Sequence, residues 1–255
     1  MTVQHSAPPL SQRQSAILDR VMANGYVTID ALAAEFGVSA QTVRRDIIAL
    51  SEAGQLQRFH GGAGPADAME AARLDYAAKR ELGKPAKTEV ARKAAALIPD
   101  GAALFLDVGT TIETCARELA RRKGFTIFTT SMRAAMAFDP RSHAVYVLGG
   151  RLAGKDGSLV GEDTVQKLAS IHLDVALIAC SAIDETGRVM DFDLSKIAVK
   201  RAAMAASARS MLLSTRSKFD RTALGKIADI GDFSAVVTED HPETSLALVQ
   251  APLQE

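Results

Sequence analysis

The first quarter of the chain contains segments in which apolar residues recur at helical spacing. The first apolar stripe includes Ile17 and Val21 and follows Ser11, which predicts a helix capped by the Ser11 side chain. A strand-like stretch, residues 26–29, precedes a second helix, for which we expect Asp30 to be the N-cap. These patterns predict two short helices separated by one extended segment.

A third helix is predicted by apolar residues at positions i, i+4 and i+7, which are Val43, Ile47 and Leu50. Ser39 is its expected N-cap, and Gly37 makes the tight turn that joins it to the second helix. Polar and apolar residues then alternate over residues 55–60, and Gly61 and Gly62 close the segment as in a hairpin. Two helices joined by a glycine turn and followed by a hairpin predict a winged helix-turn-helix.

From Thr88 onward, apolar runs with strand character alternate with helical patterns. The strand-like runs are residues 102–107, 125–130, 144–150, 174–179, 211–214 and 235–238. Such an alternation is typical of an α/β fold in which a mostly parallel sheet is covered by helices.

The segment between these two regions is rich in alanine and charge and has glycine and proline at both ends. We interpret it as a linker with helical stretches. The expected organisation is a winged helix-turn-helix domain over residues 11–63, a linker over 64–87 and an α/β domain over 88–250.

Composition narrows the class of protein. Apolar residues make up 47% of the 255 positions and tryptophan is absent, so we expect a core of aliphatic side chains. With 30 basic and 30 acidic residues, the net charge is zero, which argues against coating of nucleic acid but allows a local basic patch. Cys115 and Cys180 are far apart and predict reduced thiols. Without an apolar leader or a long apolar run, we expect a cytoplasmic protein with no membrane partner.

The third helix carries the residues that we expect to contact DNA. If Val43 and Ile47 face the core, the polar residues at the start of this helix face outward. Arginine can form paired hydrogen bonds with guanine, and glutamine with adenine. The hairpin would contact the DNA backbone as a wing. The candidate DNA-binding residues are Ser39, Gln41, Thr42, Arg44, Arg45, Arg58 and His60.

A solvated, charged helix face is the simpler alternative. Five arginines and five acidic residues balance between residues 11 and 60, so the charge count alone does not favour DNA. Only the clustering of Arg44, Arg45, Arg58 and His60 favours it.

A family resemblance favours DNA binding more strongly. The run SAQTVRRDIIALSEAGQLQRFHGGA (39–63) resembles the signature of the DeoR family of bacterial sugar-metabolism regulators. That signature is S-x-x-T-[VI]-R-R-D-[LI]-x-x-L followed by G-x-L-x-R-x-HGGA, and every fixed position is present. The resemblance continues through almost the whole chain. It implies a winged helix followed by a sensor domain related to ribose-5-phosphate isomerase.

The segment ALFLDVGTT suggests an anion site in the α/β domain. We expect a strand that runs into a turn, followed by a helix from about Ile112, whose first N–H groups can bind an anion. Thr110 and Thr111 add hydroxyls, and Asp107 can accept a hydrogen bond from a ligand hydroxyl. The alternative is that the GTT turn only caps the helix. Ligands in open α/β sheets bind at the carboxyl ends of the strands, which favours the first interpretation.

The resemblance extends this candidate site. In the family pattern, the GTT turn resembles the phosphate loop of the isomerase, and Lys200 and Lys218 occupy basic positions. The candidate effector-binding residues are Asp107, Gly109, Thr110, Thr111, Ser131, Gly150, Asp184, Lys200 and Lys218. Segments 149–162 and 189–202 resemble the glycerol-3-phosphate-responsive subgroup. Thr130 and Ser214 depart from the family pattern, which usually has Asn and Asp there, and leave the identity of the effector open.

These observations favour a repressor of carbohydrate or glycerol catabolism genes that is relieved by a small phosphorylated metabolite, with glycerol 3-phosphate first. The expected partners are double-stranded operator DNA, the effector and further copies of the chain, as a dimer or tetramer. A regulator that responds to a different sugar phosphate is an alternative interpretation. A second alternative is an isomerase-like enzyme that uses Asp184, Asp191 or Asp193 as the base, although an isomerase has no use for a helix-turn-helix. We expect no catalytic residue, no cofactor and no metal, since the five histidines show no ligand spacing.

Overall fold

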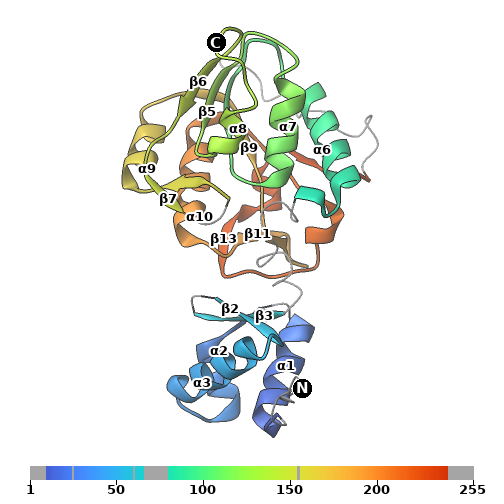
Figure 1. Cartoon of the computed structure of the whole chain (residues 1–255), viewed down its shortest axis with the longest axis vertical. Helices are drawn as coiled ribbons and strands as arrows, with labels where there is room; N and C mark the ends of the chain where they lie inside the picture. The colour runs from blue at the N-terminus through green and yellow to red at the C-terminus, as the bar shows by residue number, and fades with distance from the viewer. Residues whose placement is uncertain (1–9, 25, 60, 66–79, 154–155, 241–255) are drawn as a thin grey trace, which may run out of the picture. The chain divides into compact units, whose positions relative to one another are not determined.

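The computed structural model describes residues 10–240 apart from 25, 60, 66–79 and 154–155 (Figure 1). The described chain divides into two compact units, the first within residues 1–75 and the second from residue 76 onward apart from 221–224. Within these described ranges, no helix is long and apolar enough to span a membrane.

The first unit is a winged helix-turn-helix, as expected. In chain order its elements are α1 (Gln12–Asn24), β1 (Val27–Thr28), α2 (Ile29–Phe36), α3 (Ala40–Glu52), β2 (Leu56–Phe59) and β3 (Gly62–Pro65). Strand β3 pairs antiparallel with both β1 and β2. The β2–β3 hairpin is the wing.

The caps and turns of this unit confirm two expectations and correct one. Ser39 caps α3, and Gly37 ends α2 in the left-handed conformation with φ 63°. The N-cap of α2 is Thr28, whose hydroxyl accepts from Ala31 N–H, and not Asp30. Asp30 instead lies in the first turn, where its negative charge complements the helix dipole.

The second unit contains a six-stranded sheet in the order β14-β12-β9-β4-β5-β6. The strands are β4 (Ala103–Leu106), β5 (Thr126–Thr129), β6 (Ala144–Val147), β9 (Leu173–Ile178), β12 (Ser207–Leu213) and β14 (Ala235–Val237). Every pairing in this sheet is parallel, in agreement with the expected mostly parallel sheet. Strand β12 begins four residues before the expected Met211, because polar residues from Ser207 onward also pair with β9.

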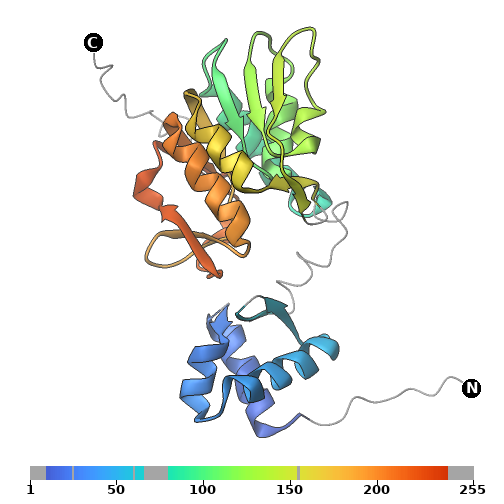
Figure 2. The same cartoon turned by 90° about the vertical axis from the view of Figure 1, so that its left-hand side faces the viewer.

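Helices cover both faces of this sheet (Figures 1 and 2). On one face lie α6 (Lys84–Ala96), α7 (Thr110–Leu119) and α8 (Met132–Ala135), whose apolar residues share one core with the sheet. On the other, α9 (Glu162–Ala169) and α10 (Leu194–Ala205) lie side by side over a second core. The layered α/β architecture is therefore confirmed.

Several short elements were not predicted from the sequence. They are the hairpin β7 (Arg151–Ala153) and β8 (Ser158–Val160), the antiparallel strands β10 (Ala182–Ile183), β11 (Arg188–Asp191) and β13 (Gly225–Asp229), and the 3-10 turns η1 (Arg216–Lys218) and η2 (Ile230–Asp232). In the segment expected as a linker, β3 continues to Pro65 and α6 begins at Lys84. Residues 66–79 of that segment lie outside the described residues.

His143 is a buried polar residue in the first of the two sheet cores. Its side chain is 4% exposed and its ring lies against Phe125 and Phe138, with centroid distances of 5.8 and 5.1 Å. Neither ring nitrogen has a hydrogen-bond partner among the described residues. A buried polar group without a partner destabilises the fold by about 1–3 kcal/mol.

We therefore expect His143→Phe to raise the free energy of unfolding by about 1 kcal/mol, because the unsatisfied nitrogens are removed while an aromatic ring remains. Urea denaturation at neutral pH measures this change. The exposed His172 provides the matched control, since His172→Phe should give no gain. A loss of stability in His143→Phe would contradict the prediction and would indicate a bound water on the imidazole.

Candidate DNA-binding and effector sites

Two ion pairs within the helix-turn-helix unit neutralise two of its arginines. The Nε of Arg13 on α1 lies 2.6 Å from a carboxylate oxygen of Asp46 on α3, and Asp46 is only 7% exposed. The hydrogen bond to Asp46 raises the pKa of Arg13. Arg20 and Glu35 form a second pair at 2.6 Å, between α1 and α2. These pairs hold the three helices together, and they use two arginines and two acidic residues of the balance noted in the sequence, which leaves three of each.

The arginines of the candidate DNA surface are left without such partners. Arg44 and Arg45 on α3 and Arg58 on β2 are exposed, and none of them forms an ion pair within the described part of the chain. Gln41 is exposed beside them. His60 lies outside the described residues. The described face of α3 and the wing thus presents uncompensated positive charge, which suits a phosphate backbone.

Ser39 and Thr42 have a structural role at the start of the same helix. The Ser39 hydroxyl accepts from the Thr42 N–H at 3.2 Å, and the two hydroxyl oxygens are 2.9 Å apart. Ser39 is exposed and Thr42 is half-buried. The cap therefore fixes the first turn of α3, from which Gln41 and Arg44 extend.

The strand order of the second unit reverses at β4. From β4 the chain continues to β5 and β6 on one side, and it then returns to β9 on the other side of β4. Asp107 follows β4 and Ala179 follows β9, so both lie at the carboxyl edge where the strand order reverses. Open α/β sheets bind ligands at this point.

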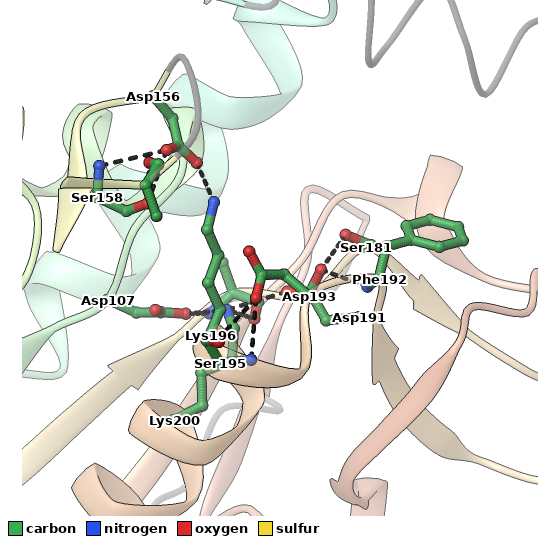
Figure 3. A network of polar contacts seen from close by, with 12 residues as sticks. Asp107, Asp156, Ser158, Ser181, Asp191, Phe192, Asp193, Ser195, Lys196 and Lys200 are labelled. Atoms are coloured by element: carbon green, nitrogen blue, oxygen red, sulfur yellow. Dashed lines mark hydrogen bonds and ion pairs between the residues drawn. The ribbon is translucent and has the colours of Figure 1, made fainter. Parts of the chain in front are cut away.

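Lys200 of α10 reaches Asp107 at this edge of the sheet (Figure 3). Its Nζ forms an ion pair with Asp107, donates to the Ala179 carbonyl at 2.8 Å and lies 3.3 Å from an oxygen of Asp191. Lys200 and Asp107 are each 1% exposed. Burial would lower the pKa of Lys200, but the two carboxylates raise it above its usual value, so the ammonium group stays charged. The structure thus pairs two predicted ligand-binding residues with each other.

The GTT turn lies against the end of β9. Helix α7 begins at Thr110, two residues before the expected Ile112, so Thr110 and Thr111 belong to its first turn. Gly109 precedes it with φ 137°, and a Cβ there would lie 3.6 Å from the Ala179 side chain. The first N–H groups of a helix have no partner within the helix and can bind an anion.

The remaining predicted residues have different surroundings. Ser131 follows β5 and caps α8 by accepting from Ala134 N–H at 3.1 Å. Gly150 follows β6, and a Cβ there would lie 2.6 Å from the Val160 carbonyl, so packing against β8 explains the glycine. Both lie at the same carboxyl edge as Asp107, since β4, β5 and β6 are parallel.

Asp184 is not part of this edge group. Its carboxylate accepts from Thr186 and from the backbone and side chain of Arg188, within the turn between β10 and β11. Burial raises its pKa, but these hydrogen bonds together hold the pKa of Asp184 below its usual value. A structural role in the turn accounts for this carboxylate.

Lys218 in η1 follows β12 and is close to Cys180. Burial raises the pKa of the Cys180 thiol to about 11, while a hydrogen bond to Ser214 and the charges of Lys200 and Lys218 lower it. Ser214, where the family pattern usually has Asp, is thus a neutral neighbour of a neutral thiol. Lys218 and Lys200 therefore lie near the same residue at the sheet edge.

A small hollow opens beside the Lys200 group. Its lining residues are Asp107, Val108, Thr130, Ser158, Leu159, Val160, Lys196 and Val199. Thr130, the other departure from the family pattern, is among them. Lys196 was not predicted, although it lies one helical turn before Lys200 on the same face of α10, and that spacing was a usable signal. Ser158 belongs to a hairpin that the sequence pattern did not reveal.

Glu113 is a second residue that was not predicted from the sequence. It lies on α7 next to the GTT turn and is 3% exposed. Burial raises its pKa to about 7, while the charges of Arg117 and Arg133 lower it and that of Asp156 raises it. Its nearest ion-pair contact is Arg117 at 3.6 Å. A charged residue within the apolar stripe of α7 was the available signal.

We expect Glu113→Gln to stabilise the protein by about 3 kcal/mol at pH 8 and to have little effect near pH 4.5. Between about pH 4.5 and 7, folded Glu113 retains a proton that the unfolded chain releases, so wild-type stability falls as pH rises through this window. Glutamine does not ionise. Urea denaturation of both proteins across this range measures the difference, with the exposed Glu162→Gln as the control. A pH-independent difference would contradict the prediction.

Comparison with known proteins identifies the family. Residues 13–68 match the family profile described as "DeoR-like helix-turn-helix domain". Residues 84–240, more than half of the chain, match "DeoR C terminal sensor domain". The chain belongs to the DeoR family.

Three curated relatives of this DeoR-family chain are named as repressors. The glycerol-3-phosphate regulon repressor of Haemophilus influenzae is 34% identical over 91% of each chain. The protein of the same name from Escherichia coli is 34% identical over 94% of each chain. The HTH-type transcriptional repressor CsqR of Escherichia coli is 32% identical over 92% of this chain and 89% of its own.

Solved structures resemble parts of the DeoR-family chain. Ribose 5-phosphate isomerase A from Methanocaldococcus jannaschii has a TM-score of 0.40 and 18% identity, covering 53% of this chain and 54% of its own. The eIF2B beta subunit from Chaetomium thermophilum has a TM-score of 0.46 and 11% identity, covering 89% of this chain and 77% of its own.

Proposed function

We propose that this DeoR-family protein is a transcriptional repressor of glycerol or carbohydrate catabolism genes. Helix α3 enters the major groove of operator DNA and the β2–β3 wing contacts the backbone. The proposal rests mainly on the charge distribution of the first unit. Arg13 and Arg20 are paired with acidic residues. The exposed arginines of α3 and the wing, by contrast, form no ion pair among the described residues; they are Arg44, Arg45 and Arg58. The names of the relatives support the repressor role.

The effector in this proposal is a small phosphorylated metabolite, and glycerol 3-phosphate is the favoured candidate. The phosphate contacts the first turn of α7 at Gly109, Thr110 and Thr111, beside the carboxyl ends of β4 and β9. Lys218 adds positive charge at the same edge. The glycerol-3-phosphate regulon repressors among the relatives support this choice of ligand.

Effector and DNA bind one chain, so each changes the affinity for the other by the same factor. Two copies of the chain would place two recognition helices on successive turns of DNA. An effector that favours a different spacing of these helices would then release the operator. A dimer or tetramer in the cytoplasm is part of this proposal.

We expect no isomerase turnover, because each candidate base has another role. Asp184 is held in its turn, Asp191 contacts Lys200, and Asp193 caps α10 by accepting from Ser195 and Lys196 N–H. Incubation with ribose 5-phosphate tests this expectation.

Thermal shift and operator release with a panel of ligands test the effector proposal. The panel contains glycerol 3-phosphate, fructose 1-phosphate, ribose 5-phosphate, glucosamine 6-phosphate and each unphosphorylated parent. We expect phosphates to act and parents not to act. Equal effects of the parents would contradict the phosphate site, whereas a stronger sugar phosphate would change only the identity of the effector.

Thr111→Ala should weaken the response to the best phosphate by about 1.5–3 kcal/mol at most, since one hydrogen bond to a charged group is removed. Operator affinity without effector should stay within about twofold, because Thr111 lies in the other unit. The matched control is Thr114→Ala on the same helix, whose hydroxyl donates to the Thr110 carbonyl at 2.8 Å. A larger loss in Thr114→Ala than in Thr111→Ala would contradict the assignment.

A further inference from the structure

Two lysines of α10 face the carboxyl edge with different partners (Figure 3). The Nζ of Lys200 is held at the sheet edge by Asp107, Asp191 and a backbone carbonyl. The Nζ of Lys196 instead reaches Asp156, which lies between β7 and β8, and Lys196 lines the hollow. The Lys196 side chain is 15% exposed, so part of it remains accessible to solvent.

Asp156 is held in place for this ion pair by the start of β8. One of its carboxylate oxygens accepts from the Ser158 hydroxyl at 2.8 Å and from the Ser158 N–H at 3.2 Å, and the other accepts from Lys196. Burial raises the pKa of Asp156, but the hydrogen bonds from Lys196 and Ser158 and the charge of Lys196 outweigh this effect. Together they hold the pKa of Asp156 below its usual value, so the carboxylate is charged. The hairpin itself is attached to the sheet edge, since Leu159 N–H donates to the Thr130 carbonyl at 2.8 Å.

The charges around the hollow determine where an anion can bind. Among its lining residues, Asp107 and Lys196 are the charged ones, and Asp107 is already neutralised by Lys200. Lys196 is neutralised only by Asp156 within the described residues. An anion in the hollow repels Asp156 and competes with it for the same ammonium group. A phosphate carries more charge than a carboxylate and forms strong charge-assisted hydrogen bonds.

We propose that Lys196 binds the phosphate of the effector and that Asp156 competes with the effector for Lys196. Asp156 thereby sets the effector affinity, and binding breaks the ion pair that joins the β7–β8 hairpin to α10. This inference rests on the proposed function, because it concerns how the same site takes its phosphorylated ligand.

Calorimetry of the full-length protein with glycerol 3-phosphate, with the other phosphates of the panel and with inorganic phosphate tests the proposal. Asp156→Asn should bind the best phosphate about five- to tenfold more tightly than wild type, because Lys196 no longer has a charged competitor. Lys196→Gln should bind it at least tenfold more weakly, and Lys196→Arg should retain affinity within about threefold. Glycerol and the other unphosphorylated parents should show no such pattern.

The double variant Asp156→Asn/Lys196→Gln distinguishes competition from a general effect of charge. We expect it to bind phosphate as weakly as Lys196→Gln alone, because the gain from Asp156→Asn requires Lys196. The exposed Asp163→Asn on α9 removes one acidic charge elsewhere and should leave affinity unchanged. Melting temperatures confirm that each variant is folded. If Asp156→Asn is unstable, Lys196→Arg still tests the proposal. A loss of phosphate affinity in Lys196→Arg equal to that in Lys196→Gln would overturn it.

Other results would also overturn the proposal. If wild type binds a phosphate and folded Asp156→Asn binds it no more tightly, Asp156 is no competitor. If the double variant gains affinity as Asp156→Asn does, the gain comes from overall charge. If wild type binds none of the phosphates, the phosphorylated effector of the proposed function is wrong and this inference fails with it.

Discussion

Replacing Lys200 by methionine should lower the free energy of unfolding of the sensor unit by about 3–5 kcal/mol. Lys200 is the counter-ion of Asp107 and Asp191, and the first of these carboxylates is 1% exposed. Without the ammonium group, a buried charge remains with no compensation in a low-dielectric region. Urea denaturation at neutral pH measures the loss through the transition of the second unit.

Two further variants separate this cause from a packing defect. Adding Asp107→Asn to Lys200→Met removes the buried charge and should restore part of the stability, so the two substitutions are not additive. Lys167→Met on the exposed side of α9 should change stability by less than about 0.5 kcal/mol. A Lys200→Met protein as stable as wild type would show that the pair contributes nothing.

The double substitution Arg44→Ala/Arg45→Ala should weaken operator binding by about 2–6 kcal/mol, since each arginine that binds a base edge contributes about 1–3 kcal/mol. Both side chains are exposed on α3, and the core residues Val43 and Ile47 are untouched. The fold should therefore survive, which circular dichroism checks. Gel shifts with a duplex selected by the wild-type protein from random sequences measure the affinity.

A matched arginine of the same unit provides the control. Arg20 is exposed but paired with Glu35, so Arg20→Ala should change operator affinity by less than about threefold. The dependence of binding on salt should also become less steep in the double variant if Arg44 or Arg45 binds a phosphate. Unchanged affinity in that variant would exclude α3 as the recognition helix.

Elements defined by local periodicity could be predicted from the sequence. The stripe of Val43, Ile47 and Leu50 is fully buried, and the strand-like runs from residue 102 onward all form strands of one sheet. The sequence pattern defines a helix boundary less well where two neighbouring residues can both act as the N-cap. Thr28 caps α2 rather than Asp30, because the helix begins at Ile29 and its N-cap must precede it.

The candidate site depends on contacts that periodicity does not encode. The sequence pattern predicts separate ligand-binding roles for Asp107 and Lys200. In the structure these residues, 93 positions apart in the chain, neutralise each other. The Arg13–Asp46 pair similarly joins residues 33 positions apart. Pairing between distant charges follows from the packing of elements, so it becomes visible only once the sheet and the helices are placed.

The strand order also affects the sequence in which the two units fold during synthesis. The buried apolar core of the helix-turn-helix consists of residues between Ile17 and Ala63, so this core can form early in translation. The centre of the sheet needs Leu104 to pair with Val175, and β4 therefore waits for most of the second unit. Pairings this distant in the chain form slowly because a long loop must close first. A nascent chain therefore contains the complete core of the helix-turn-helix well before the sheet of the second unit can form.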